Sequence, residues 1–107
     1  MKDIRIDIGV CTALDIDLTA VDFRGIEGVI FTVKNYPTPD APEVIERVFK
    51  EPGIHKVVIT PEESLALSAT AQYDFCMELA DGKRFKMTNN GKIVLRRAVG
   101  DCIDNRS

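Results

Sequence analysis

Few residues in this 107-residue chain could carry out chemistry, and their spacing does not favour it. His55 is the single histidine, so neither a Ser–His–Asp nor a Cys–His arrangement has a definable base. It lies beside a turn, where we expect an exposed polar side chain rather than a catalytic one. We assign no catalytic residue, and the sequence indicates a protein that is not an enzyme.

Carboxylates are concentrated in the N-terminal segment, at Asp3, Asp7, Asp15, Asp17 and Asp22. A calcium loop needs several oxygens that converge on one ion, as in the DxDxDG pattern. The Asp15-Ile16-Asp17 segment lacks both the glycine and the closing glutamate of such a loop. Alternation along a strand explains this spacing better, so we expect neither a metal nor a cofactor. A small carbohydrate- or metal-binding sandwich remains a third possibility.

The three cysteines, Cys11, Cys76 and Cys102, are odd in number, widely spaced and without a CxxC pair. This pattern indicates free thiols in a reducing compartment rather than a disulfide framework or a zinc site. Cys76 has the outward parity of its strand, between Asp74 and Glu78, and no histidine or helix N-terminus near it in sequence would activate it. We expect a partly covered thiol, placed at an interface.

Six basic residues and no acidic ones occur between positions 83 and 97: Lys83, Arg84, Lys86, Lys92, Arg96 and Arg97. A nucleic-acid surface would combine such charge with stacking aromatics. Here Phe85 and Tyr73 have the parity of the core, and Glu78 neutralises part of the charge. We interpret the segment as a solvated or intersubunit face. An accessory role on nucleic acid, through the basic hairpin 83–97, is the alternative.

The composition is that of an ordinary globular domain, with 45% apolar residues, 29% charged residues and a net charge of −3. No window approaches the roughly 20 apolar residues of a membrane span, and charge alternates with isoleucine at the N-terminus, unlike a secretory signal. We expect one domain over residues 1–100 and a frayed C-terminal tail over 101–107.

Period-two alternation predicts strands over most of the chain. Residues 43–51 fit either a short helix or a strand, and we choose a strand. Thr60-Pro61-Glu62-Glu63 is a capping box, which predicts a short helical turn near residues 61–67. The fold class expected is all-β, an immunoglobulin-like antiparallel β-sandwich of seven to eight strands.

Side-chain parity also decides the type of the last two turns. A three-residue loop at Ala80-Asp81-Gly82 pairs Met77 with Phe85 and Glu78 with Arg84, which keeps the carboxylate off the core face. A three-residue loop at Asn89-Asn90-Gly91 likewise pairs Met87 with Ile93 and Arg84 with Arg96. The outer face of these two hairpins is our candidate interaction surface, made of Cys76, Glu78, Arg84, Lys86 and Arg96.

The order of motifs from Leu18 to Val99 resembles the small β-sandwich domain at the N-terminus of phage baseplate and receptor-binding tail proteins. The matching pieces are Asp17-Leu18-Thr19, the strand from Val29 to Lys34, the segment from Val58 to Leu67, Tyr73-Asp74-Phe75, Leu79, the Asp81-Gly82 turn and Gly91-Lys92-Ile93. Unlike the family, this chain has Ala69-Thr70-Ala71-Gln72 where a glycine usually precedes the tyrosine strand, and it lacks the large receptor-binding region.

The resemblance implies a phage or prophage structural protein, of tail or baseplate type, that acts as a protein–protein assembly module. It implies other phage structural subunits as partners, a possible homo-oligomer, and neither a membrane nor nucleic acid as the main target. The protein would occur in the virion, or in the bacterial cytoplasm before assembly. No host-receptor role and no catalytic residue is carried over.

Overall fold

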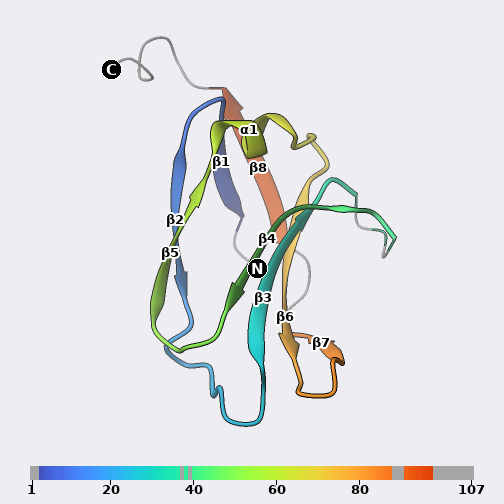
Figure 1. Ribbon diagram of the computed structural model, residues 1–107. Helices are drawn as coiled ribbons and strands as arrows, with labels where there is room; N and C mark the ends of the chain where they lie inside the picture. The colour runs from blue at the N-terminus through green and yellow to red at the C-terminus, as the bar shows by residue number, and fades with distance from the viewer. Residues whose placement is uncertain (1–2, 37, 39, 88–90, 98–107) are drawn as a thin grey trace.

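The computed structural model describes residues 3–36, 38, 40–87 and 91–97. The described chain is mostly strand with one short helix, so the all-β class is confirmed (Figure 1). The elements, in chain order, are β1 (Ile4–Ile8), β2 (Thr12–Asp17), β3 (Gly28–Lys34), β4 (Glu43–Phe49), β5 (Ile54–Ile59), α1 (Pro61–Leu65), β6 (Gln72–Glu78), β7 (Arg84–Lys86) and β8 (Gly91–Arg97). The choice of a strand for residues 43–51 is confirmed by β4.

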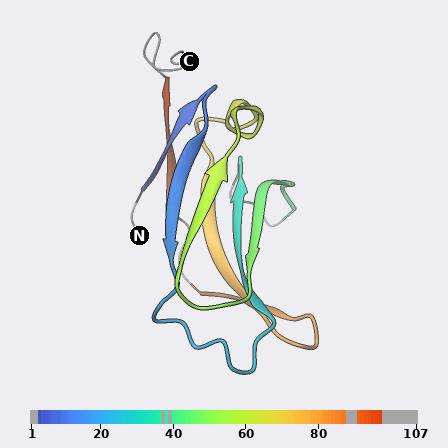
Figure 2. The same cartoon turned by 60° about the vertical axis from the view of Figure 1, so that its left-hand side comes forward.

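The strands form two sheets that face one another (Figure 2). The large sheet has the order β1-β8-β6-β3-β4, with β7 also paired to β6, and the small sheet consists of β2 and β5. One pair departs from the antiparallel expectation, because β1 and β8 run parallel with Ile4 opposite Ile93. Strands far apart in sequence can pair in parallel without a direct connection, and local alternation does not encode such a pair.

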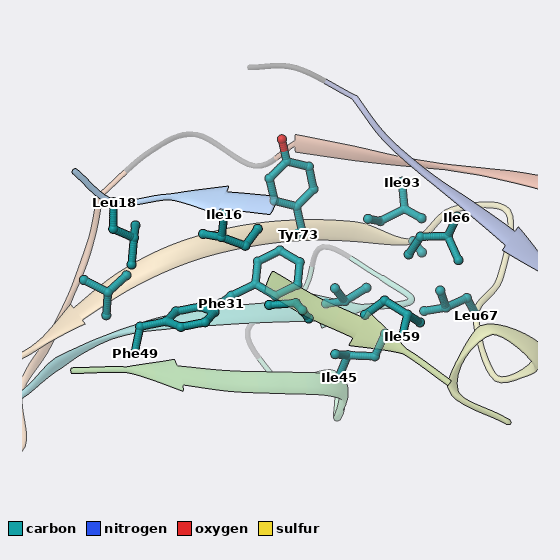
Figure 3. Close-up of a cluster of buried hydrophobic side chains, with 14 residues drawn as sticks. Ile6, Ile16, Leu18, Phe31, Ile45, Phe49, Ile59, Leu67, Tyr73 and Ile93 are labelled. Carbon is teal, nitrogen blue, oxygen red and sulfur yellow. The ribbon is translucent and has the colours of Figure 1, made fainter. Parts of the chain in front are cut away.

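Side chains from both sheets fill the space between the layers (Figure 3). Phe31 of β3 is fully buried, and its ring lies 5.8 Å from that of Tyr73 and 5.2 Å from that of Phe75. Ile16 and Ile59 contribute to the same core from the small sheet. Burial of each large apolar side chain contributes about 1.5–3 kcal/mol, so the core stabilises the small sheet on the large one.

The first predicted hairpin is confirmed in both its register and its loop. Met77 lies opposite Phe85, and Glu78 lies opposite Arg84. The Leu79 amide donates to the Lys83 carbonyl over 2.9 Å, which leaves the predicted three residues in the loop. Its glycine at position 82 has a φ of 87°, the left-handed conformation that this loop type requires.

The second predicted hairpin is wrong. Met87 donates its amide hydrogen to the Phe75 carbonyl over 2.8 Å, whereas Gly91 lies opposite Tyr73. Strands β7 and β8 therefore follow one another along the same edge of β6 and do not pair with each other. Asn89 and Asn90, which the predicted loop contains, lie outside the described residues.

Beyond its short contact with β6, β8 pairs along its length with β1. Ile93 consequently lies opposite Ile4 rather than Met87, and Arg96 lies opposite Asp7 rather than Arg84. The physical reason is that the alternating apolar residues of β1 need a partner strand to be buried, and β8 supplies it. β7 and β8 also both pair with β6, along the same edge, and a hairpin between them would displace those pairings.

The capping box at the start of α1 is confirmed, although the helix ends at Leu65, two residues earlier than predicted. The Glu63 amide donates to Thr60 Oγ1, and the Thr60 amide donates to Glu63 Oε1. Arg47 of β4 donates to the same carboxylate over 2.8 Å and also to the Val58 carbonyl of β5. Buried Ser64 accepts a 2.8 Å bond from the Gly9 amide. The helical turn thus ties both sheets together.

The predicted tail, 101–107, lies outside the described residues, and the assignment of 1–100 to one domain stays a prediction. Among the described residues, no helix is long and apolar enough to cross a bilayer. The helix α1 has five residues, whereas a membrane-crossing helix needs about 20 apolar ones.

Acid should weaken the fold through Glu63. Burial raises the pKa of Glu63, but the bonds from Arg47 and Thr60 outweigh this and hold the pKa below its ordinary value. A depressed carboxyl pKa stabilises the fold above the pKa of the unfolded chain, and this contribution is lost as the pH falls through the folded pKa. We expect Glu63→Gln to lower the unfolding free energy by about 1 kcal/mol at pH 7. In urea denaturation this difference should shrink below pH 4.5, the ordinary value, whereas Glu62→Gln should change little.

A side chain at position 91 should destabilise the protein, because an added Cβ would overlap the ring of Tyr73. We expect Gly91→Ala to cost about 1–3 kcal/mol in denaturant unfolding, the usual cost of overpacking. In a Tyr73→Ala background the same substitution should cost much less, since the obstructing ring is gone. An equal cost in both backgrounds would contradict the Tyr73–Gly91 contact.

Candidate functional site

The candidate surface lies on the outer face of the large sheet, the side that points away from the small sheet. Residues directly opposite one another in paired strands project to the same side. The pairs Ile30–Val48, Ile30–Cys76 and Cys76–Lys86 therefore place four side chains in one row across β4, β3, β6 and β7. Phe31, the neighbour of Ile30, points into the core.

The centre of this row is apolar and unusually well covered. Ile30 is only 1% exposed although it does not belong to the core cluster, and the described strands place no second sheet on this side. Its neighbour Val48 is 49% exposed. The outer face therefore presents a small apolar spot, with Val48 still accessible to a partner.

Charged side chains of both signs surround this apolar spot. Arg84 Nε lies 3.3 Å from Glu78 Oε2, and Arg84 Nη1 lies 4.0 Å from Glu46 Oε2. Because Glu46 is on β4 and Arg84 on β7, the two side chains together span β6 and β3. Surface ion pairs of this kind stabilise a fold by at most about 1 kcal/mol, so the charges remain available for exchange with a partner.

Cys76 lies within this ring of charges and is half-buried. Burial raises the pKa of the Cys76 thiol, and the nearby Asp74 carboxylate raises it further, while Arg84, Lys86 and Lys34 act in the opposite direction. The net pKa lies above the ordinary value, so the thiol stays protonated at neutral pH. Because the thiolate is the reactive form, this site is suited to contact rather than to nucleophilic chemistry.

Four of the five residues predicted for the surface come together: Cys76, Glu78, Arg84 and Lys86. Arg96 does not join them: it lies opposite Asp7 of β1, and β8 pairs with β6 only at Gln72 and Tyr73, whereas Arg84 lies opposite Glu78 at the other end of β6. The basic residues of 83–97 consequently form no single patch in the described chain: Arg84 faces two glutamates, and Lys83 lies 3.9 Å from Asp81.

Sequence reasoning missed three residues of the site, Ile30, Val48 and Glu46. Their parity is readable, since Ile30 alternates with the inward-pointing Val29 and Phe31. The missing information is strand order, because β4 and β3 become neighbours of β6 and β7 only in the folded sheet. An apolar residue at an outward-facing position was the one signal in the sequence.

The other candidates have structural surroundings. His55 is half-buried rather than exposed: its ring lies 4.9 Å from that of Phe49, and Nε2 is 2.7 Å from the Glu51 carbonyl oxygen. Asp17 accepts two hydrogen bonds from Thr19 at the end of β2. Among the described residues, no three His, Cys, Asp or Glu side chains are grouped closely enough to hold a metal ion.

No protein-family model matches this sequence, and no curated protein matches it significantly.

The Cys76 thiol should react slowly with iodoacetamide at pH 8. Its raised pKa lowers the thiolate fraction, whereas Cys11 is exposed. We expect peptide mapping by mass spectrometry to show Cys76 alkylated at least about tenfold more slowly than Cys11. Asp74→Asn should accelerate the reaction at Cys76, because it removes a negative neighbour. Equal rates at the two cysteines would contradict this account of the site.

Proposed function

We propose that this chain is a non-enzymatic structural protein of a phage or prophage particle, of tail or baseplate type. It acts as a protein–protein assembly module, and it docks on another structural subunit through the outer face around Ile30. It would occur in the virion, or in the bacterial cytoplasm before assembly. The motifs from Leu18 to Val99 support the particle class, and the outer face supports the mode of action.

The observation that carries the proposal is the half-exposed Val48 next to the covered Ile30, within a ring of charges. Protein interfaces commonly combine an apolar centre with a polar rim. A partner that covers Val48 removes more apolar surface from water, at about 25 cal/mol per Å². Its own charges can replace the weak Arg84–Glu46 contact, so that little stabilisation is lost on binding.

We further propose that the sandwich is of the immunoglobulin type. The order β8-β6-β3-β4 in the large sheet supports this, since it corresponds to strands G, F, C and C′ of a variable-type domain. Strands β2 and β5 then take the positions of B and E in the second sheet. In such domains the G, F, C and C′ strands form one continuous face, which is the face proposed here for docking.

The proposal predicts that substitutions on the outer face abolish docking without unfolding the chain. The measurement is calorimetric titration with each tail or baseplate protein encoded beside this chain. Val48→Asp should weaken binding at least tenfold, equivalent to about 1.4 kcal/mol, and Arg84→Glu should also weaken it. Val58→Asp is the matched control, because Val58 is 47% exposed but lies on the small sheet. The affinity of this variant should stay within twofold of that of the unsubstituted chain.

Equal weakening by Val48→Asp and Val58→Asp would refute the proposed face. The assembly role would be refuted if the chain bound labelled DNA at low salt but no particle protein. Loss of the DNA binding in Arg84→Glu would then favour the nucleic-acid alternative.

A further inference from the structure

A hollow opens between the two sheets on the side of β2, away from the outer face. It has a volume of about 300 Å³, and its walls are mainly apolar, from Ile16, Leu18, Val21, Phe75 and Met87, with Asp15 and Asp17 at the rim. An engineered cavity of about 150 Å³ holds a benzene molecule. The hollow therefore has room for roughly two large apolar side chains.

One wall of the hollow is the edge of a strand rather than a strand face. Residues 15 to 18 all line it in succession, although neighbouring residues of a strand project to opposite sides. Because residues that project to both sides of the strand line the hollow, the β2 backbone itself must border it. In the described chain β2 pairs only with β5, on its other side, so this edge offers backbone hydrogen-bonding groups as well as an apolar floor.

The path of β1 leaves this edge open. After Ile8 the chain turns over Gly9 and enters β2, but β1 pairs with β8 of the large sheet rather than with β2 (Figure 2). An open strand edge beside apolar surface is a template for pairing with another chain, which natural proteins usually block. Here the described residues do not block it.

We propose that the β2 edge accepts an extended segment of a partner protein, in which apolar side chains alternate with basic ones. The segment adds a strand beside residues 15–18, and its inward side chains fill the hollow against Phe75 and Met87. Its outward side chains then lie next to Asp15 and Asp17, the charged residues among the described lining. Opposite charges at such cross-strand positions are favourable, which selects a basic segment.

A strand fits this site better than a small apolar molecule. A small molecule could fill the apolar hollow, but it would leave the backbone groups of the β2 edge without strand partners. A strand of four to five residues satisfies those groups and fills the same space. This site is separate from the outer face, so it survives or fails independently of the docking proposed there.

The test fuses a designed strand, Lys-Ile-Lys-Val-Lys, to the N-terminus of the full chain through a Gly/Ser linker of about 20 residues. Such a linker spans roughly 25 Å and supplies a millimolar effective concentration. The control fusion carries Lys-Lys-Ile-Val-Lys, which has the same composition but no alternation. Amide hydrogen exchange at residues 15–18, followed by NMR, reports whether the β2 edge is paired.

We expect the alternating fusion to slow exchange at least tenfold for those amides of residues 15–18 that point toward the hollow, relative to the control fusion. Asp15→Lys, an exposed substitution, should remove most of that protection by placing like charges opposite each other. Equal exchange in both fusions would overturn the proposal. So would a dimeric unfused chain whose β2 edge is already protected, since the occupant would then be a second copy.

Discussion

Strand β3 must bury both of its faces, and the rest of the structure is arranged to make this possible. Val29, Phe31 and Val33 fill the space between the sheets, while Ile30 and Thr32 are buried on the opposite side. The inner face is covered by the small sheet, whose two strands would be marginal alone. The outer face is covered only by side chains of neighbouring strands. The docking proposed above would complete this thin cover.

The two edges of the small sheet, formed by β5 and β2, contact the large sheet differently. On the β5 side, Arg47 joins the Val58 carbonyl to the carboxylate of Glu63, so the gap between the sheets is closed by a charged, hydrogen-bonded contact. On the β2 side the described residues provide no corresponding contact near Asp15, and an apolar hollow remains. The two sheets are therefore joined at one edge and left open at the other, which is where the proposed partner strand would pair.

The sequence predicts well what depends on neighbours along the chain. Local patterns identified the inward residue Tyr73, the capping box at Thr60 and the three-residue loop before Lys83, although Phe85, which was assigned the same core parity as Tyr73, is 50% exposed. They failed where a strand chooses among distant partners: β8 pairs in parallel with β1, so Arg96 lies far from Arg84. Strand order is a property of the whole sheet, and for the same reason Val48 could not be assigned to the site from the sequence.

The outer face around Ile30 is the contact surface that we propose. Methyl-detected NMR of the isotope-labelled chain, alone and with the particle subunit proposed as its partner, tests this most directly. We expect shifted or broadened resonances for the methyl groups of Ile30 and Val48, with those of Val58 and Ile54 on the small sheet unchanged. Changes confined to Val58 and Ile54, with Ile30 and Val48 unaffected, would contradict it.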